Sequence, residues 1–165
     1  MTRIRIAEHR LPTSYINNQD MADLGIQAEA LIRIRGPRQP AALLLVFDKP
    51  ASLQAFWSRA FGSELGNACG AVRPHWCDIE DYSIPGKTRT WAEVDKNLVC
   101  TIGLCRTHLT SEIIAHEACH AGFAHAARFK PGIWDDSGSE EEDVCYPTGL
   151  LTSAINDFVH EKGFL

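Results

Sequence analysis

The sequence predicts an α+β fold, in which a small mixed or antiparallel sheet packs against a helix carrying a His-Glu-x-x-His motif and against a C-terminal helix. Continuous apolar runs at 41–47 and 98–104 are typical of buried strands. Two later segments, 111–130 and 140–160, combine helix-start signals with the length of long helices. The chain has 165 residues and 45% hydrophobic residues, which is enough for one domain with a single core over 1–165.

The first half of the chain predicts two strands and a helix. Residues 28–35 alternate in polarity and, with the apolar run at 41–47, are expected to form strands separated by a Gly-Pro pair. A helix should follow, with Ser52 as its N-cap and Gly62 at its end. Residues 63–90 carry Gly, Pro, Asn and Asp at short intervals, which predicts irregular structure with one or two short strands.

The second half predicts a strand followed by two helices. After the strand at 98–104, Thr110 is a suitable N-cap for a helix over 111–130, which a Pro-Gly pair stops. The last helix is expected over 140–160. Pro147 lies inside it, so a kink or a broken second turn is expected there.

Charge and hydropathy exclude several classes of partner. The formal net charge of −5 gives no basic surface for nucleic acid. No run approaches the ~18 apolar residues of a membrane-spanning helix. The N-terminus alternates charged and apolar residues and lacks the unbroken apolar stretch of a signal peptide. We therefore expect a cytoplasmic protein with no nucleic-acid or membrane partner.

The chain carries six cysteines, at Cys69, Cys77, Cys100, Cys105, Cys119 and Cys145. In a reducing cytoplasm they are expected to be buried thiols rather than a disulfide framework. An alternative is a second zinc site, in which Cys69, His75 and Cys77 would be joined by Cys100 or Cys105. Their role as small apolar core residues is the simpler interpretation.

The segment His116-Glu117-Ala118-Cys119-His120 carries the chemistry. Histidines at i and i+4 lie on one face of a helix, so both imidazoles can reach one metal ion. The intervening Glu117 lies slightly round the helix, where its carboxylate can act as general base on a water bound to the metal. The alternative is a pair of core histidines with no metal, in which case a buried Glu117 needs other compensation for its desolvation.

Three neighbours of the motif have simpler interpretations. His125 lies five residues after His120, which turns it off the metal face, so a surface or core histidine is expected. Cys119 is expected to be a packing thiol. His108 is expected in a loop or capping role.

The stretch from Thr101 to Leu151 resembles the metal-binding half of the zincins, and more narrowly small metallopeptidase-like proteins of bacteriophages and bacteria. The resemblance rests on Leu109-Thr110-Ser111-Glu112-Ile113-Ile114, on the His-Glu-x-x-His motif, and on Glu141-Glu142-Asp143-Val144-Cys145-Tyr146. The longer metzincin pattern does not fit, because Gly122 and His125 each come one residue too early. The resemblance does not extend to the first hundred residues.

The resemblance implies a zincin-like fold and a zinc-dependent metallopeptidase acting on a peptide or protein. It implies Zn²⁺ held by His116 and His120, with Glu117 as the catalytic base, and a host cytoplasm if the chain is phage-encoded. It also implies that the strand at 98–104 lies along the cleft and offers an edge for a peptide, the alternative being an interior strand of the sheet. The alternative is a catalytically inactive, zinc-stabilised regulatory or binding protein.

A catalytic zinc site needs a third protein ligand, and the start of the last helix offers acidic candidates. These are Glu140, Glu141 and Glu142, together with Asp135, Asp136 and Asp143. The helical phase places Glu140 and Glu141 beside the apolar stripe and Glu142 opposite it. The resemblance selects Glu141 as the third metal ligand. All three glutamates could instead complement the helix dipole.

Overall fold

The computed structural model describes the backbone of residues 5–7, 76–79 and 90–93, and both backbone and side chains of 22–34, 39–62, 64–75, 97–129 and 141–165. Its strands are β1 (Arg5–Ala7), β2 (Ile26–Arg33), β3 (Ala41–Phe47), β4 (Gly70–Pro74), β5 (Trp76–Ile79), β6 (Thr90–Glu93) and β7 (Leu98–Cys105). Its helices are α2 (Pro50–Phe61), the short 3-10 helix η1 (Arg106–His108), α3 (Ser111–Phe129) and α4 (Glu141–Glu161). The α+β class is therefore confirmed.

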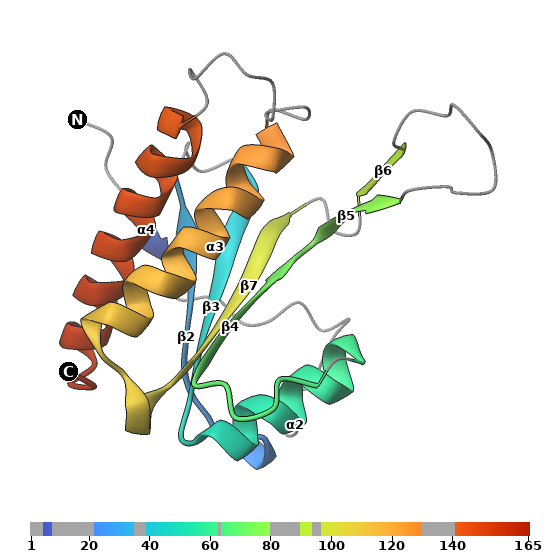
Figure 1. Ribbon diagram of the computed structural model, residues 1–165. Coiled ribbons are helices and arrows are strands. Elements are labelled where there is room, and N and C mark those ends of the chain that lie inside the picture. Colours follow the sequence, from blue (N-terminus) through green and yellow to red (C-terminus); the bar gives the residue numbers. More distant parts are fainter. Residues whose placement is uncertain are drawn as a thin grey trace.

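A five-stranded sheet forms the centre of the fold, in the order β1-β2-β3-β7-β4. The β3–β7 pair is parallel and the other three pairs are antiparallel, so the sheet is mixed. Helices α3 and α4 cover one face, and α2 covers the other (Figure 1). Strands β5 and β6 form a separate two-stranded ribbon.

Strand β7 is an interior strand, which corrects the expectation that it forms the edge of a cleft. It pairs with β3 on one side and with β4 on the other, and every residue from Leu98 to Cys105 is buried. A strand covered on both faces and paired on both edges gives a continuous apolar run, which is the pattern of 98–104. The edge strand next to it is β4.

Each face of the sheet builds its own part of the core. Between the sheet and α3 and α4 lie Ile102, Leu104, Ile114, Leu151 and Ile155, all essentially inaccessible to solvent. On the other face, α2 contributes Leu53, Phe56 and Trp57, and the rings of Phe47 and Phe56 pack 5.4 Å apart. Gly103 of β7 lies directly under Leu53 and Trp57, so its missing side chain lets α2 approach the sheet.

The ends of α2 differ in part from the prediction. The helix begins at Pro50 with Lys49 as N-cap, not at Ser52, because proline fits the first helical position and fixes its own backbone angle. Gly62 ends it as predicted, in the left-handed conformation at φ 63°.

Thr110 caps α3 as predicted, since its Oγ1 accepts a hydrogen bond from the backbone N–H of Ile113 at 3.2 Å. Helix α4 runs from Glu141 to Glu161 through Pro147, so the expected break in its second turn does not occur. Ser139, which begins a Ser-x-x-Glu capping-box pattern in the sequence, lies outside the described residues.

Helices α3 and α4 run antiparallel and pack closely at Gly122 (Figure 1). A Cβ at this position would lie 3.0 Å from the carbonyl oxygen of Val144 and would overlap the hydroxyl of Thr148. The missing side chain of Gly122 therefore lets α4 approach α3 closely. Ala118 and Ala121 are buried beside it, whereas Ala115 and Phe123 are exposed.

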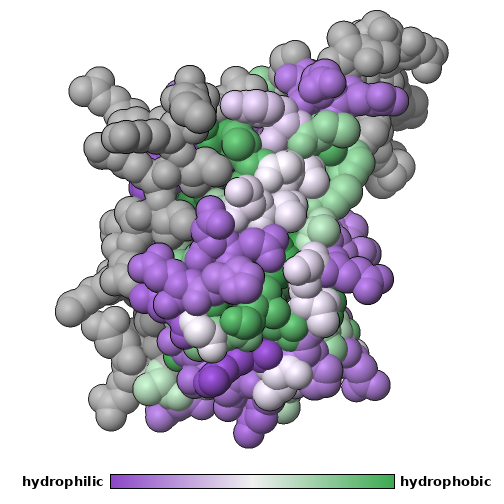
Figure 2. All heavy atoms as spheres, turned by 90° about the vertical axis from the view of Figure 1, so that its left-hand side faces the viewer, coloured by the Kyte–Doolittle hydropathy of each residue, from purple (hydrophilic) through white to green (hydrophobic). Residues whose placement is uncertain are grey.

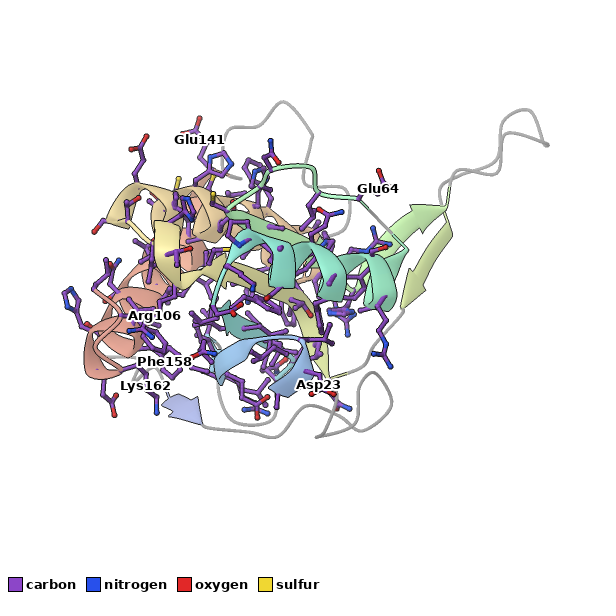
Figure 3. All side chains as sticks on the ribbon, turned by 90° about the horizontal axis from the view of Figure 1, so that it is seen from below. Asp23, Glu64, Arg106, Glu141, Phe158 and Lys162 are labelled. Atoms are coloured by element: carbon purple, nitrogen blue, oxygen red, sulfur yellow. The ribbon has the colours of Figure 1, made fainter. Side chains whose placement is uncertain are left out.

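The outer face of α4 is directed to solvent. Figure 2 shows this side of the molecule, where hydrophilic residues are interrupted by smaller hydrophobic areas. At the end of the helix, Lys162 lies over the ring of Phe158 at 5.6 Å, and Arg106 lies over the ring of Phe164 at 5.1 Å (Figure 3).

Of the helices in the described ranges, none has the length and apolar character needed to cross a membrane.

Two buried cysteine thiols are expected to make the folded protein less stable at alkaline pH. Burial raises the pKa of Cys100, and burial followed by the nearby Cys69 and Asp48 raises that of Cys105, both from 9.0 to about 12. Between pH 9 and 12 the unfolded chain therefore releases protons that the folded chain keeps, so stability falls as the pH rises. At pH 10 the expected loss is about 1 kcal/mol for each thiol. Urea unfolding at pH 8 and pH 10 in the presence of a reductant measures it.

The Cys100→Ala variant provides the control for this loss. It should weaken the pH dependence by about half, whatever its effect on stability at pH 8. An unchanged dependence would mean that Cys100 does not titrate differently in the folded and unfolded states.

Candidate active site

The two histidines of the motif lie side by side on the exposed face of α3. The Nε2 atoms of His116 and His120 are 3.2 Å apart, and their ring centroids are 4.8 Å apart with an interplanar angle of 76°. Both side chains are exposed. The i, i+4 spacing therefore brings both Nε2 atoms to one point above the helix surface, as the sequence predicts.

This pair fits two ligands of a single zinc ion. Zn–N distances near 2.1 Å and a tetrahedral angle place two ligand nitrogens about 3.4 Å apart. The observed 3.2 Å is close to this separation, so little movement of either ring would be needed. Neutral imidazole nitrogens are also the donors that zinc prefers.

Glu117 is buried between α3 and the edge strand β4. Its exposed fraction is 6%, in contrast to the histidines on either side of it. A Cβ on Gly70 would come within 2.7 Å of both Cγ and Oε1 of Glu117 and within 2.9 Å of Cδ. The carboxylate therefore occupies the space that any side chain at position 70 would fill, and it lies against the backbone of β4.

The environment of Glu117 favours proton uptake. Burial raises the pKa of this carboxyl group, and the nearby His116 partly opposes the shift. A carboxylate that loses solvation becomes a stronger base, and a general base works best with a pKa closer to the working pH. The burial of Glu117 and the raised pKa of its carboxyl group both suit the role of general base that the sequence predicts.

The structure does not bring Glu141 to the histidine pair. Gly122 of α3 packs against Val144 and Thr148 of α4, so in this antiparallel arrangement Glu141 lies beside the last turn of α3. That turn is roughly 9–13 Å along the helix axis from His120. Gly122 faces α4. About the axis of α3 it is rotated by more than ~100° from both histidines. Glu141 is exposed at the periphery of the molecule (Figure 3).

Within the part of the chain that the structure describes, no group of three or more His, Cys, Asp or Glu side chains is arranged to hold a metal ion. This includes Glu142 and Asp143, which are placed with Glu141 in the first turn of α4. The other acidic candidates, Asp135, Asp136 and Glu140, lie outside the described residues. The structure thus brings together the two histidines that the sequence predicts as ligands, but places no third candidate ligand beside them within the described residues.

The cysteines follow the core interpretation only in part. Cys100 and Cys105 are buried and Cys69 is half-buried, but Cys119 and Cys145 are exposed, so Cys119 is not the expected packing thiol. The alternative of a second zinc site would include the side chain of Cys77, which lies outside the description.

Other polar residues near the motif take local roles. His108 is exposed in η1, with Nδ1 2.9 Å from Oγ1 of Thr107. His125 is buried and its ring packs 4.6 Å from that of Phe129, which agrees with a core histidine. Tyr146 is 54% exposed on α4.

Sequence reasoning missed Gly70 as part of the site. The residue lies in a stretch expected to be irregular, and nothing local to it signals a contact with Glu117. Only the antiparallel pairing of β4 with β7 brings it under α3.

Comparisons of the chain with protein-family models, with curated proteins and with solved structures find no match. The zincin interpretation therefore depends on the sequence pattern and on the geometry of this site.

Proposed function

We propose that the chain is a zinc-dependent metallopeptidase of zincin type, with His116 and His120 as metal ligands and Glu117 as general base. The observation that carries the proposal is the joint geometry of the three side chains. Two exposed Nε2 atoms converge at 3.2 Å, and the carboxylate between them in sequence is buried against β4. Zinc bound there would polarise a peptide carbonyl and acidify water, and Glu117 would accept the proton.

The edge strand β4 supplies a surface for an extended peptide. Hydrogen bonds from Cys105 N–H to Cys69 O and from His75 N–H to Val99 O fix which residues of the ladder face β7. In an antiparallel ladder the alternate residues, Gly70 and Val72, then direct their N–H and C=O groups to the outer edge. None of the described strands pairs with that edge. A substrate strand added there would pass the backbone of Gly70, next to the carboxylate of Glu117.

A structural zinc site, the alternative, is less well supported. Structural sites are closed by four protein ligands, whereas catalytic sites leave one position open. Both histidines are exposed, and a purely structural site has no use for a buried carboxylate beside them. A catalytic function accounts for both features.

Metal analysis of protein purified without a histidine tag tests the proposal. After zinc is supplied and the excess removed, we expect close to one zinc per chain in the wild type. Little zinc should remain in His120→Ala, because one nitrogen cannot hold the ion at comparable affinity. Replacing the exposed His108, which lies outside the pair, should leave the zinc content unchanged. A wild type without stoichiometric zinc would refute the proposal.

The same measurement assigns the third ligand. Glu141→Ala lowers zinc affinity if the expectation from the sequence holds, and leaves it unchanged if Glu141 stays beside the last turn of α3. The variants Asp135→Ala, Asp136→Ala and Glu140→Ala examine the other acidic candidates under the same conditions.

A further inference from the structure

Two cysteines lie directly opposite each other where β4 meets β7. Gly70 pairs with Leu104, so the same register places Cys69 opposite Cys105. The backbone N–H of Cys105 donates a hydrogen bond to the carbonyl oxygen of Cys69 at 3.0 Å, which shows that the ladder extends to this pair. Opposed residues in such a pair have Cα atoms about 5.5 Å apart, within the range of disulfides.

The two side chains share the α2 face of the sheet. Directly opposed residues of an antiparallel pair project to the same face, and side chains alternate along each strand. Gly70 faces α3 and Glu117, so Cys69 and Cys105 face the other way. Cys105 accordingly packs in the core that α2 covers, and Cys69 is close enough to help raise its pKa.

We propose that Cys69 and Cys105 are a redox modification site, which closes to a reversible disulfide across β4 and β7. Cys69 is half-buried and therefore accessible to a small disulfide, whereas Cys105 is buried and reached only from within the molecule. Cys69 is therefore the thiol that reacts first with the oxidant, and Cys105 then attacks the mixed disulfide formed at Cys69.

The chemistry is thiol–disulfide exchange with a low-molecular-weight disulfide such as oxidised glutathione. The Cys69 thiolate attacks one sulfur of the oxidant, forming a mixed disulfide and releasing one thiolate. Cys105 then gives up its proton and attacks Sγ of Cys69, which displaces the second thiolate. Two protein thiols are oxidised, the two electrons reduce the oxidant to two thiols, and no atom is unaccounted for.

The bond would act on the strand that borders the proposed active site. Hydrogen-bonded pairs hold their Cβ atoms near 5.5 Å, and a disulfide needs about 3.8 Å, so closure must draw β4 and β7 together. Gly70, the residue after Cys69, contacts Glu117. The consequence for hydrolysis depends on the proposed function, whereas the formation of the bond does not.

Peptide mapping of the intact, folded chain tests the bond itself. The protein is equilibrated with reduced and oxidised glutathione at several ratios, with a chelator present, then acid-quenched, alkylated after unfolding and digested without reduction. We expect a linked peptide pair containing Cys69 and Cys105, lighter by two hydrogens, whose yield rises with the oxidised fraction and is reversed by a reductant. Neither zinc nor peptidase activity enters the measurement.

Cys100→Ala provides a matched control, since Cys100 is a buried thiol on the same strand and lies opposite Pro74. The linked pair should persist in Cys100→Ala, while Cys105→Ala should stop at Cys69 joined to glutathione. The proposal is overturned if folded wild type gives only that mixed disulfide, with Cys105 fully alkylated. It is equally overturned if Cys69 links to the exposed Cys119 or Cys145 instead.

Discussion

Replacing Glu117 by Gln should abolish peptidase activity while zinc and fold are kept. Gln retains the shape of the side chain and its hydrogen-bonding capacity, but it cannot accept a proton at neutral pH. Loss of a general base typically lowers kcat by about 10²-fold or more. The burial of Glu117 also makes the neutral amide easier to accommodate than the charged carboxylate, so Glu117→Gln should be at least as stable as the wild type.

The measurement requires a verified substrate, which a peptide library cleaved by the zinc-loaded wild type would provide. Glu112→Gln is the matched control, because Glu112 is an exposed glutamate in the first turn of the same helix. It removes the same charge from α3 without touching the site, and should leave kcat within about twofold of the wild type. Equal rates for Glu117→Gln and the wild type would exclude Glu117 as the base.

The elements predicted best are those in which burial determines the pattern of apolar residues along the whole element. The run at 41–47 matches β3 to the residue, and 98–104 matches β7 to within one residue. Helices α3 and α4 begin and end within one residue of the predicted bounds, because Thr110 and the segment around residue 140 carry clear start signals. The histidine pair follows from helical periodicity alone.

The features missed depend on contacts between distant parts of the chain. Strand β4 consists of Gly-Ala-Val-Arg-Pro, which has little strand character of its own and becomes a strand by pairing with β7. The apolar run of β7 reveals burial but not which neighbours flank it, so the edge role was preferred over the interior position. The position of Glu141 depends on how α4 packs against α3, and helical phase within α4 carries no information on that.

Gly70→Ala should lower kcat about as strongly as a direct change at the base, although the residue takes no part in the chemistry. The backbone of Gly70 lies in an ordinary strand conformation, so alanine adds no backbone strain. Its Cβ would instead come within 2.7 Å of Oε1 of Glu117, closer than such contacts allow, and must displace the carboxylate. Misplacement of a catalytic group by about 1 Å can cost 10²-fold in rate. Kinetics and zinc analysis should show a fall of about that size in kcat with the metal retained.

Gly103→Ala on β7 separates this effect from simple overpacking. Its Cβ would meet Leu53 at 2.5 Å and Trp57 at 2.8 Å on the opposite face of the sheet, away from Glu117. Overpacking of this kind costs about 1–3 kcal/mol, so the variant should lose stability and keep its kcat. Combining Gly70→Ala with Glu117→Gln should add little further loss of rate, because both changes remove the same base. Fully additive losses would show that Gly70 acts through something other than the position of Glu117.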